Sequence, residues 1–303
     1  MSLLICGDWG TSSLRLRLVS AGTVIAETAS DRGIAAIFSE WSAAGGPRDS
    51  FYLSVLSDAI ALLGPEAAGC DIVLSGMASA NIGLRELPYK DLPVRTDGSD
   101  LHTSIISASV SFPHRLLLIS GVRSARDVMR GEETQLAGCP AVEGAHRFIF
   151  PGTHSKHIHV QGNTVVDFST FMTGEFFALL SRQSLLSKSV TENVSLQPEA
   201  FERGVADGAG ADLLRSAFWV RTNQLFEQLT PLQNYHYLSG LLIGSELGGL
   251  SADDVPGTIV GNALQNKQYV AAASVLGLTD VRALDASLIS IKGQCLIQMH
   301  FIR

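Results

Sequence analysis

The sequence predicts an α/β protein built from two similar domains, and three observations support this. Segments that alternate like half-buried strands are followed by longer segments with helical periodicity. One arrangement of three strands around a Gly-Thr turn occurs twice, at residues 3–29 and 147–171. The length of 303 residues and a hydrophobic content of 46% are sufficient for two cores of ordinary size.

Charge and composition exclude several classes of function. The net charge is -7 and no block of Lys and Arg is present, which argues against a nucleic-acid surface. No apolar run reaches the roughly 18 residues of a membrane span, and the first residues are interrupted too early for a signal peptide. The four cysteines are far apart in the sequence, as expected of reduced thiols. We therefore expect a cytoplasmic protein that binds a small polar molecule.

The repeated arrangement contains the same turn in both copies. The apolar run at 3–6 leads into GDWGTSS, after which LRLRLVS alternates strictly. RFIF at 147–150 leads into PGTHS, and KHIHV alternates in the same way. Corresponding residues of the turns are 142 positions apart: Gly10 and Gly152, Thr11 and Thr153, Ser13 and Ser155. The repeat predicts that each domain begins with the same strand-turn-strand unit.

These turns have the chemistry of phosphate-binding loops. Glycine lets the backbone approach closely, and hydroxyl and main-chain N–H groups can surround a phosphate. Only the first turn has an acid, Asp8, which is suited to holding Mg²⁺ through water. Two such turns facing each other across a cleft would hold a polyphosphate from both sides. The predicted phosphate-binding residues are Asp8, Gly10, Thr11, Ser12, Gly152, Thr153, Ser155 and Lys156.

The order of the motifs points to a family. Six segments follow one another between Asp8 and Leu247: DWGTSSLRLRL, SGMASANIGLRELPY, VMRGEETQLAG, PGTHSKHIHV, FMTGEFFALL and YLSGLLIGSEL. Together they resemble the 2-dehydro-3-deoxygalactonokinase family of the actin, Hsp70 and sugar kinase superfamily. The resemblance implies two ribonuclease-H-like (actin-like ATPase) domains with an interdomain cleft, over residues 1–142 and 143–303. It also implies ATP and Mg²⁺ as cofactors and phosphorylation of the 6-hydroxyl of 2-dehydro-3-deoxy-D-galactonate.

A predicted helix after Gly131 begins with two acids, which suits the positive end of a helix dipole. This segment resembles the Gly-Asp-Gln-Gln segment of the larger FGGY carbohydrate kinases, whose Asp accepts the substrate hydroxyl proton. The resemblance places Glu132 at that position, so we predict Glu132 as the catalytic base, with Glu133 and Asp127 as rivals. Glu is one methylene longer than Asp, which affects a proton transfer that requires about 2.6–3.2 Å.

A polar loop after the apolar strand at 71–77 is predicted to bind the sugar acid, because open α/β sheets usually bind ligands at strand carboxyl ends. The alternative for this segment is an ordinary surface loop. Thr173 and Glu175, in the segment FMTGEFFALL, are also predicted to contact the substrate, and the alternative for them is a helix cap. Arg123 and Arg85 are the cations we consider for the carboxylate. The predicted substrate-binding residues are Met77, Ser79, Asn81, Glu86, Tyr89, Arg123, Thr173 and Glu175.

Two segments of the second half are predicted to border the nucleoside. HYLSGLLIGSEL places Gly240 and Gly244 on one helix face, where a second helix or an adenine ring could approach. PGTIVGNAL is a strand and turn before a helix, and it is similar to the superfamily's adenosine motif. That similarity implies Gly261 and Asn262 beside the nucleoside and Tyr269 along the helix. An ordinary strand-helix unit explains the same pattern.

Other segments receive weaker assignments. Gly and Pro gather at 138–146, where we predict a hinge. The histidines of HSKHIH at 154–159 are not predicted to bind metal, because no Cys or carboxylate completes the set there. Lys156 is either a γ-phosphate contact or a solvated lysine. We assign nothing after Asp285.

Two other functions use the same turns. An actin-like or exopolyphosphatase-like hydrolase would transfer phosphate to water. A kinase-like sugar sensor would bind without catalysis. The sequence is compatible with a homodimer, and it predicts sugar acid and ATP as partners, without nucleic acid or membrane.

Overall fold

The computed structural model describes residues 3–192, 195–250 and 257–302. The chain forms two compact units. Unit 1 comprises Met1–Gly144, Val160–Asp167 and Ser287–Arg303, and unit 2 comprises Ala145–His159 and Phe168–Ala286. The chain first passes between the units after Gly144, within the predicted hinge segment. The units are defined by compactness, so the predicted hinge and the predicted domain boundary after residue 142 stay predictions.

Unit 1 is built on a six-stranded sheet. In spatial order its strands are β3 (Thr23–Ser30), β2 (Leu14–Ser20), β1 (Leu3–Trp9), β4 (Asp71–Gly76), β8 (Leu116–Ile119) and β7 (Thr103–Ile106). β1, β2 and β3 pair antiparallel, β1 pairs parallel with β4 and β4 with β8, and β7 is antiparallel to β8. The predicted strands on both sides of the first turn are therefore confirmed.

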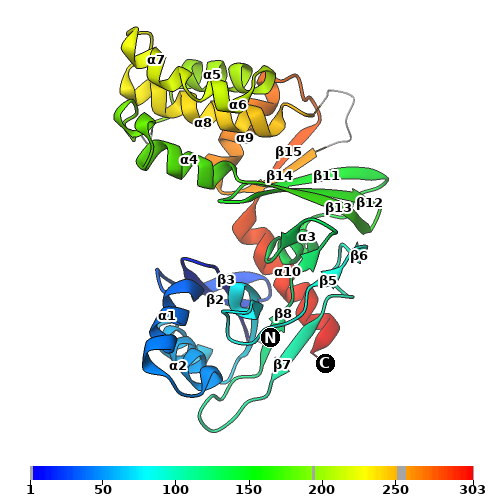
Figure 1. Cartoon of the computed structure of the whole chain (residues 1–303). Coiled ribbons are helices and arrows are strands. Elements are labelled where there is room, and N and C mark those ends of the chain that lie inside the picture. Colours follow the sequence, from blue (N-terminus) through cyan, green and yellow to red (C-terminus); the bar gives the residue numbers. More distant parts are fainter. Residues whose placement is uncertain (1–2, 193–194, 251–256, 303) are drawn as a thin grey trace. The chain divides into compact units, whose positions relative to one another are not determined.

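Helices cover both faces of this sheet. The helices of unit 1 are α1 (Ile34–Ala44), α2 (Arg48–Ala61), α3 (Glu132–Gly138) and α10 (Ala286–Phe301), with short 3-10 turns η1 (Pro65–Ala67) and η2 (Met77–Ser79). Successive strand side chains point to opposite faces. Ile5 and Leu16 pack with Leu56 of α2 in one core, and α1 lies beside α2 (Figure 1). From α10, Gln294 donates a hydrogen bond to the Gly7 carbonyl at 2.6 Å.

A small second sheet in unit 1 consists of β5 (Lys90–Asp91), β9 (Val122–Arg123) and β10 (Val128–Met129). β5 is parallel to β9, and β10 is antiparallel to it. These two-residue strands have no sequence pattern long enough to predict. They matter because they fix the residues at their ends.

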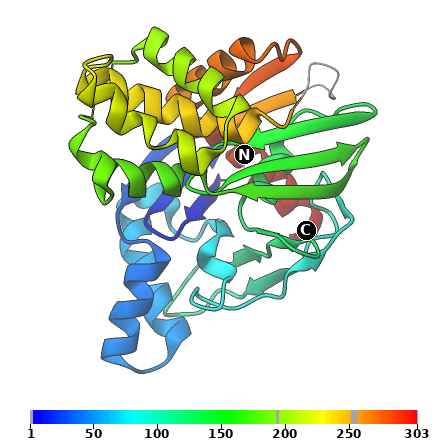
Figure 2. The same ribbon diagram turned by 45° about the horizontal axis from the view of Figure 1, so that its top comes forward.

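The sheet of the second half repeats the order of the first. Its strands are β15 (Val281–Asp285), β14 (Gly257–Gly261), β11 (Ala145–Phe150), β12 (Ser155–Gln161), β13 (Thr164–Phe171) and β6 (Val94–Arg95). β11 is parallel to β14, and β14 to β15. In Figure 2, β11, β12 and β13 form a green group of neighbouring strands. β6 pairs with the part of β13 that belongs to unit 1. The predicted α/β class and its repeated strand unit are confirmed.

The helices of unit 2 are α4 (Thr173–Arg182), α5 (Pro198–Gly210), α6 (Leu213–Ser216), α7 (Trp219–Leu225), α8 (Pro231–Leu247) and α9 (Ala263–Val275), with the 3-10 turn η3 (Leu185–Lys188). α5, α8 and α9 lie on one side of β11 and β14 (Figure 1). Ile149 and Ile259 of the sheet pack there with Val205, Ile243 and Tyr269. Within the described residues, every helix is too short or too polar for a membrane crossing.

Candidate active site

The first predicted phosphate turn follows β1. The Gly10 amide donates a hydrogen bond to the Ser13 carbonyl at 2.9 Å. Thr11 and Ser12 are exposed. The Ala35 amide, in the first turn of α1, donates to the Thr11 carbonyl at 3.1 Å. The turn therefore offers two hydroxyls on a backbone that a helix fixes, which is what a phosphate site needs.

Asp8 and Glu132 converge in unit 1. β1 and β4 pair in parallel, so Asp8 and Gly76 lie near neighbouring strand ends. Gly76 has φ +82°, and a Cβ on it would lie 3.0 Å from Asp8 Oδ1. Gly131 has φ +116°, and a Cβ on it would lie 3.7 Å from the Gly76 Cα. Glycine adopts such φ values at little cost. The two glycines therefore bring α3, which begins at Glu132, beside the first turn.

The electrostatics of Asp8 agree with this convergence. Burial raises the pKa of Asp8 above its ordinary value, Arg15 and Arg17 oppose the increase, and the charge of Glu132 adds to it. A divalent cation would offset both the burial and the repulsion between the acids. Within residues 3–192, 195–250 and 257–302, no group of three or more His, Cys, Asp or Glu could hold a metal.

The two neighbouring acids differ in their surroundings. Glu133 is buried, and its carboxylate accepts hydrogen bonds from the Gly131 amide at 2.7 and 2.9 Å and from the Thr134 hydroxyl at 3.0 Å. Burial raises the pKa of Glu133 to about 7, and the charge of Glu132 adds to the increase. Glu132 is half-buried and accepts from the Arg130 amide at 3.0 Å. Because Glu133 holds its own helix terminus, Glu132 remains the stronger candidate for the base.

The third acid and two predicted substrate contacts lie in loops, and a further predicted contact, Met77, begins η2. The Asp127 amide donates to the Ser124 hydroxyl at 3.0 Å, which closes the turn between β9 and β10. Met77 is half-buried, whereas Asn81 and Glu86 are exposed. Their exposure suits both a substrate contact and an ordinary loop, so their role stays a prediction.

Two predicted substrate contacts, Ser79 and Tyr89, come together at Arg130. Ser79 is buried, and its hydroxyl donates to the Ile119 carbonyl at 2.6 Å. Arg130 Nη1 donates to the Ser79 carbonyl at 2.9 Å, and the guanidinium carbon lies 4.3 Å from the centroid of the Tyr89 ring. Arg130 is not among the residues predicted from the sequence.

The two arginines proposed for the carboxylate already have acidic partners. Arg123 pairs with Asp91 at 2.6 Å, and Arg85 pairs with Asp49 at 2.7 Å. Both pairs are largely exposed. Neither guanidinium is therefore an uncommitted cation.

The second turn is fixed by α4 as the first is fixed by α1. The Glu175 amide donates to the Thr153 carbonyl at 3.0 Å. A Cβ on Gly174 would lie 2.8 Å from the Thr153 Cα, and a Cβ on Gly33 would lie 2.3 Å from the Thr11 carbonyl oxygen. A glycine at each helix start therefore permits the close approach. The repeat extends to the helix after each hairpin.

The buried carboxylate of Glu246, on α8, joins the second turn to three helices. It accepts hydrogen bonds from the Ser155 hydroxyl at 2.6 Å, from His157 Nε2 at 2.9 Å and from the Tyr269 hydroxyl at 2.7 Å. The Thr173 hydroxyl also donates to it. Burial acts to raise the pKa of Glu246, but its hydrogen bonds, first the one from His157, outweigh burial and lower the pKa. Ser155 and Thr173 are therefore positioned by this carboxylate.

Two other predicted residues have different surroundings. Glu175 Oε2 lies 2.5 Å from His154 Nε2, so this pair joins the turn to α4. Lys156 is only 5% exposed. The alternative of a solvated lysine is therefore wrong, while its contact with a γ-phosphate stays a prediction.

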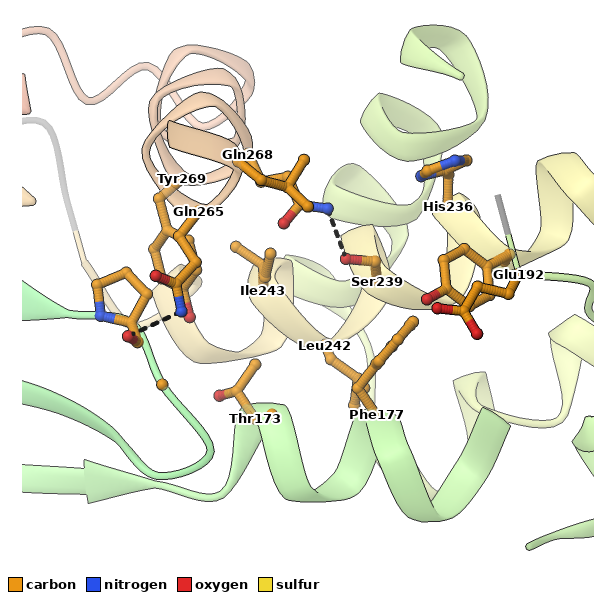
Figure 3. A pocket seen from close by; sticks show the side chains of 15 residues that line it. Thr173, Phe177, Glu192, His236, Ser239, Leu242, Ile243, Gln265, Gln268 and Tyr269 are labelled. Carbon is orange, nitrogen blue, oxygen red and sulfur yellow. Dashed lines mark hydrogen bonds between the residues drawn. The ribbon is translucent and has the colours of Figure 1, made fainter. Parts of the chain in front are cut away.

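A cavity of about 250 Å³ lies beside the second turn within unit 2 (Figure 3). Its lining combines apolar side chains with polar ones and includes Gly152, Thr173, Phe177, Glu192, His236, Ser239, Leu242, Ile243, Gln265, Gln268 and Tyr269. Gln265 Nε2 donates to the Pro151 carbonyl at 3.0 Å, and Gln268 Nε2 donates to Ser239 Oγ at 3.3 Å. A mostly apolar pocket with a few polar groups is typical of a small-molecule site.

The predicted nucleoside residues separate into two groups. Gly261 ends β14, and Asn262 caps α9 by accepting from the Gln265 amide at 2.9 Å. They therefore position the start of α9, whose residues Gln265, Gln268 and Tyr269 line the cavity. Gly240 and Gly244 instead face α5. A Cβ on Gly240 would lie 2.1 Å from the Phe201 carbonyl oxygen, and one on Gly244 would lie 2.2 Å from the Val205 carbonyl oxygen. Helix packing accounts for these two glycines, so their assignment to the nucleotide is corrected.

Sequence reasoning missed Glu246 and Arg130. A lone acid within an apolar helix is a signal, because buried acids usually have partners. Glu246 follows LSGLLIGS and carries that signal. Arg130 has no comparable signal, because its partners lie in distant segments.

Comparison with known proteins identifies relatives along nearly the whole chain. The model of a family described as 2-keto-3-deoxy-galactonokinase matches residues 8–297. A Rhizobium meliloti protein named "Probable 2-dehydro-3-deoxygalactonokinase DgoK1" is 34% identical over 296 residues, covering 92% of this chain and 91% of its own. An Escherichia coli 2-dehydro-3-deoxygalactonokinase is 29% identical over 248 residues, covering 80% of this chain and 78% of its own.

A solved structure agrees with these relatives. The crystal structure of a "putative 2-dehydro-3-deoxygalactonokinase protein" from Sinorhizobium meliloti has a TM-score of 0.83 and 30% sequence identity. The similarity covers 99% of this chain and 97% of that one. Neither a hydrolase nor a sugar sensor is favoured by these matches.

Proposed function

The chain belongs to the 2-keto-3-deoxy-galactonokinase family, and from that premise we propose that it transfers the γ-phosphoryl group of ATP to the 6-hydroxyl of 2-dehydro-3-deoxy-D-galactonate. Membership makes it a phosphotransferase that acts on a sugar acid. The observation that carries the finer proposal is the convergence of Asp8 and Glu132 beside the first turn. Phosphoryl transfer needs mainly positioning and charge stabilisation. The arrangement supports the proposal because a cation held at Asp8 and a base at Glu132 would supply them.

Each group in unit 1 has one role in the proposal. The Thr11 and Ser12 hydroxyls and the turn backbone hold phosphate oxygens. Asp8 holds Mg²⁺ through water, and the cation neutralises phosphate charge when bound. Glu132 accepts the proton of the attacking hydroxyl, which requires a heavy-atom distance of about 2.6–3.2 Å in the complex.

Unit 2 is proposed to bind the rest of the nucleotide. Gly152, Thr153 and Ser155 would contact phosphate oxygens, with Lys156 near the γ-phosphate. The cavity beside this turn would take the nucleoside, because its apolar side chains suit a base and its amides can donate to or accept from base edges. Closure of the two predicted domains around both ligands would exclude water, the competing acceptor.

The decisive experiment is a coupled assay of ADP formation with a panel of sugar acids. ADP should form with 2-dehydro-3-deoxy-D-galactonate and not in its absence. Glu132→Gln should lower kcat by about 10²-fold or more, the usual contribution of a positioned base. Glu133→Gln, the matched neighbour, should keep kcat within about tenfold of the wild type.

Two outcomes would contradict the proposal. ADP formation that no sugar acid changes would indicate a hydrolase. Unchanged turnover of Glu132→Gln would place the base elsewhere.

We also propose a cytoplasmic location, because ATP is the substrate and the four cysteines are unpaired thiols in the structure.

A further inference from the structure

Arg130 is held in place by hydrogen bonds and an aromatic ring, and within the part of the chain that the structure describes it forms no ion pair with an acid. Its Nη1 donates to the Ser79 carbonyl at 2.9 Å and to the Ser79 hydroxyl oxygen at 2.6 Å. Its guanidinium stacks on the Tyr89 ring at 4.3 Å. Among the described residues, Nε of Arg130 is buried without a hydrogen-bond partner. A buried donor without a partner is rare in folded proteins, so the missing acceptor needs an explanation.

The small sheet brings these residues to one end. Lys90 of β5 and Met129 of β10 both pair with Val122 of β9. Tyr89, just before β5, and Arg130, just after β10, therefore lie at the same end of this sheet. Three two-residue strands thus build the stacked pair.

A glycine makes room for the stacked pair. A Cβ on Gly121, which precedes β9, would lie 2.8 Å from the Tyr89 ring and 2.4 Å from the Met129 carbonyl oxygen. Only glycine therefore allows the ring to lie this close to the strand. The guanidinium is held by the backbone on one side and by an aromatic face on the other, which is a preorganised arrangement.

Arg130 also adjoins the proposed catalytic base. Its backbone amide donates to the Glu132 carboxylate at 3.0 Å. Consecutive Cα atoms are about 3.8 Å apart, so residues 130 and 132 are separated by less than about 8 Å. A six-carbon acid that presents one end to Glu132 is long enough to reach this neighbourhood with the other.

From these contacts we infer that Arg130 binds the carboxylate of the sugar acid and selects for it. This inference rests on the proposed function. A carboxylate is ionised at neutral pH and accepts two parallel hydrogen bonds from a guanidinium, so it would supply the acceptor that Nε lacks. Arg123 and Arg85 are less suitable, because Asp91 and Asp49 already neutralise them.

The test compares the acid with a neutral analogue, the 3-deoxy-2-ketohexose in which a hydroxymethyl group replaces the carboxylate. Arg130→Met should lower kcat/KM for the acid roughly 100-fold, mainly through KM. It should leave kcat/KM for the ketose and KM for ATP within about threefold. Arg130→Lys keeps the positive charge but lacks the two parallel N–H donors of the guanidinium, so it should lower kcat/KM for the acid about tenfold.

The matched control is Arg115→Met, which removes a guanidinium that is paired with Asp71 at 2.5 Å. It should stay within about threefold of the wild type for both substrates. An equal loss for acid and ketose in Arg130→Met would show a merely structural role and overturn the inference. A rise in KM for the acid in Arg123→Met but not in Arg130→Met would also overturn it.

A separate binding experiment tests the role of Arg130 if the proposed kinase activity is not found. If the wild type phosphorylates no sugar acid, calorimetric titration of the acid without ATP decides the inference. Binding to the wild type that is at least tenfold tighter than to Arg130→Met supports it. Equal binding, or none, overturns it. If Arg130→Met does not fold, the same comparison with Arg130→Lys applies.

Discussion

The Ser155 hydroxyl donates a 2.6 Å hydrogen bond to the buried carboxylate of Glu246, 91 positions later in the chain. This contact ties the second predicted phosphate turn to α8. The same carboxylate accepts from Thr173 at the start of α4 and from Tyr269 on α9. One buried acid therefore sets the geometry of the turn and of two walls of the adjoining cavity.

Glu246→Ala should weaken ATP binding and lower stability. It leaves several buried donors without an acceptor, for which we expect a loss of about 3 kcal/mol in the free energy of unfolding. KM for ATP should rise about tenfold, because the turn and the cavity lose their common support. Thermal unfolding and initial rates at varied ATP measure the two effects.

The control for this change is Glu202→Ala, which removes an exposed carboxylate from α5. It should alter stability by no more than about 0.5 kcal/mol. If Glu246→Ala loses stability while KM for ATP stays at the wild-type value, the acid supports the fold and has no part in positioning the turn.

Asp8→Asn should raise the Mg²⁺ requirement. The change removes the negative charge that attracts the cation but keeps the shape of the side chain. We expect the Mg²⁺ concentration at half-maximal rate to rise at least tenfold, together with a lower kcat, in titrations at saturating ATP. Asp58→Asn, on α2, is the matched control and should leave the titration unchanged. An unaltered Mg²⁺ curve for Asp8→Asn would remove this residue from the cation site.

Gly240→Ala should destabilise the protein without a specific effect on ATP. The new methyl carbon would lie 2.1 Å from the Phe201 carbonyl oxygen of α5, so the two helices must separate. Overpacking of this kind costs roughly 1–3 kcal/mol. Gly210→Ala is the control, because nothing lies within 4 Å of a Cβ there. A large rise in KM for ATP at temperatures where Gly240→Ala is folded would restore the adenine alternative.

Local features of the fold were predictable from the sequence. The strands around both turns and the helices that follow Gly131, Met172 and Asn262 have clear periodicity or cap signals. The helix α10 was not assigned, although it spans 16 residues. It is buried on several sides, and at Gly293 a Cβ would lie 1.8 Å from the Thr134 carbonyl oxygen of α3. A helix buried in this way lacks the one-sided apolar pattern that identifies a surface helix.

The site was predictable only where its residues are neighbours in the sequence. The turns at Gly10 and Gly152 carry their own chemistry, so both were found. The partners of Ser79 and Ser155, which are Arg130 and Glu246, lie 51 and 91 positions away. A single sequence contains no information on such pairs. The partners of these side chains are therefore identified only in the structure.

The raised pKa of Glu133 predicts a specific pH dependence of stability. In the unfolded chain this carboxyl ionises near its ordinary value of 4.5, whereas burial raises its pKa in the folded protein to about 7. Between these values the folded state binds more protons at this group, so the stability that Glu133 contributes is greatest below pH 4.5 and falls as the pH rises through 7. The fall due to this group should be about 3 kcal/mol.

Glu133→Gln should abolish that fall, because the amide is uncharged at every pH and can still accept from the Gly131 amide. Urea unfolding of both proteins at a series of pH values measures the difference in free energy of unfolding. We expect this difference to shift in favour of the variant by about 3 kcal/mol between pH 4.5 and 8. Glu66→Gln, at an exposed position, should show no such shift. A constant difference for Glu133→Gln across the range would mean that Glu133 is already ionised in the folded protein at low pH, with its three hydrogen bonds outweighing burial.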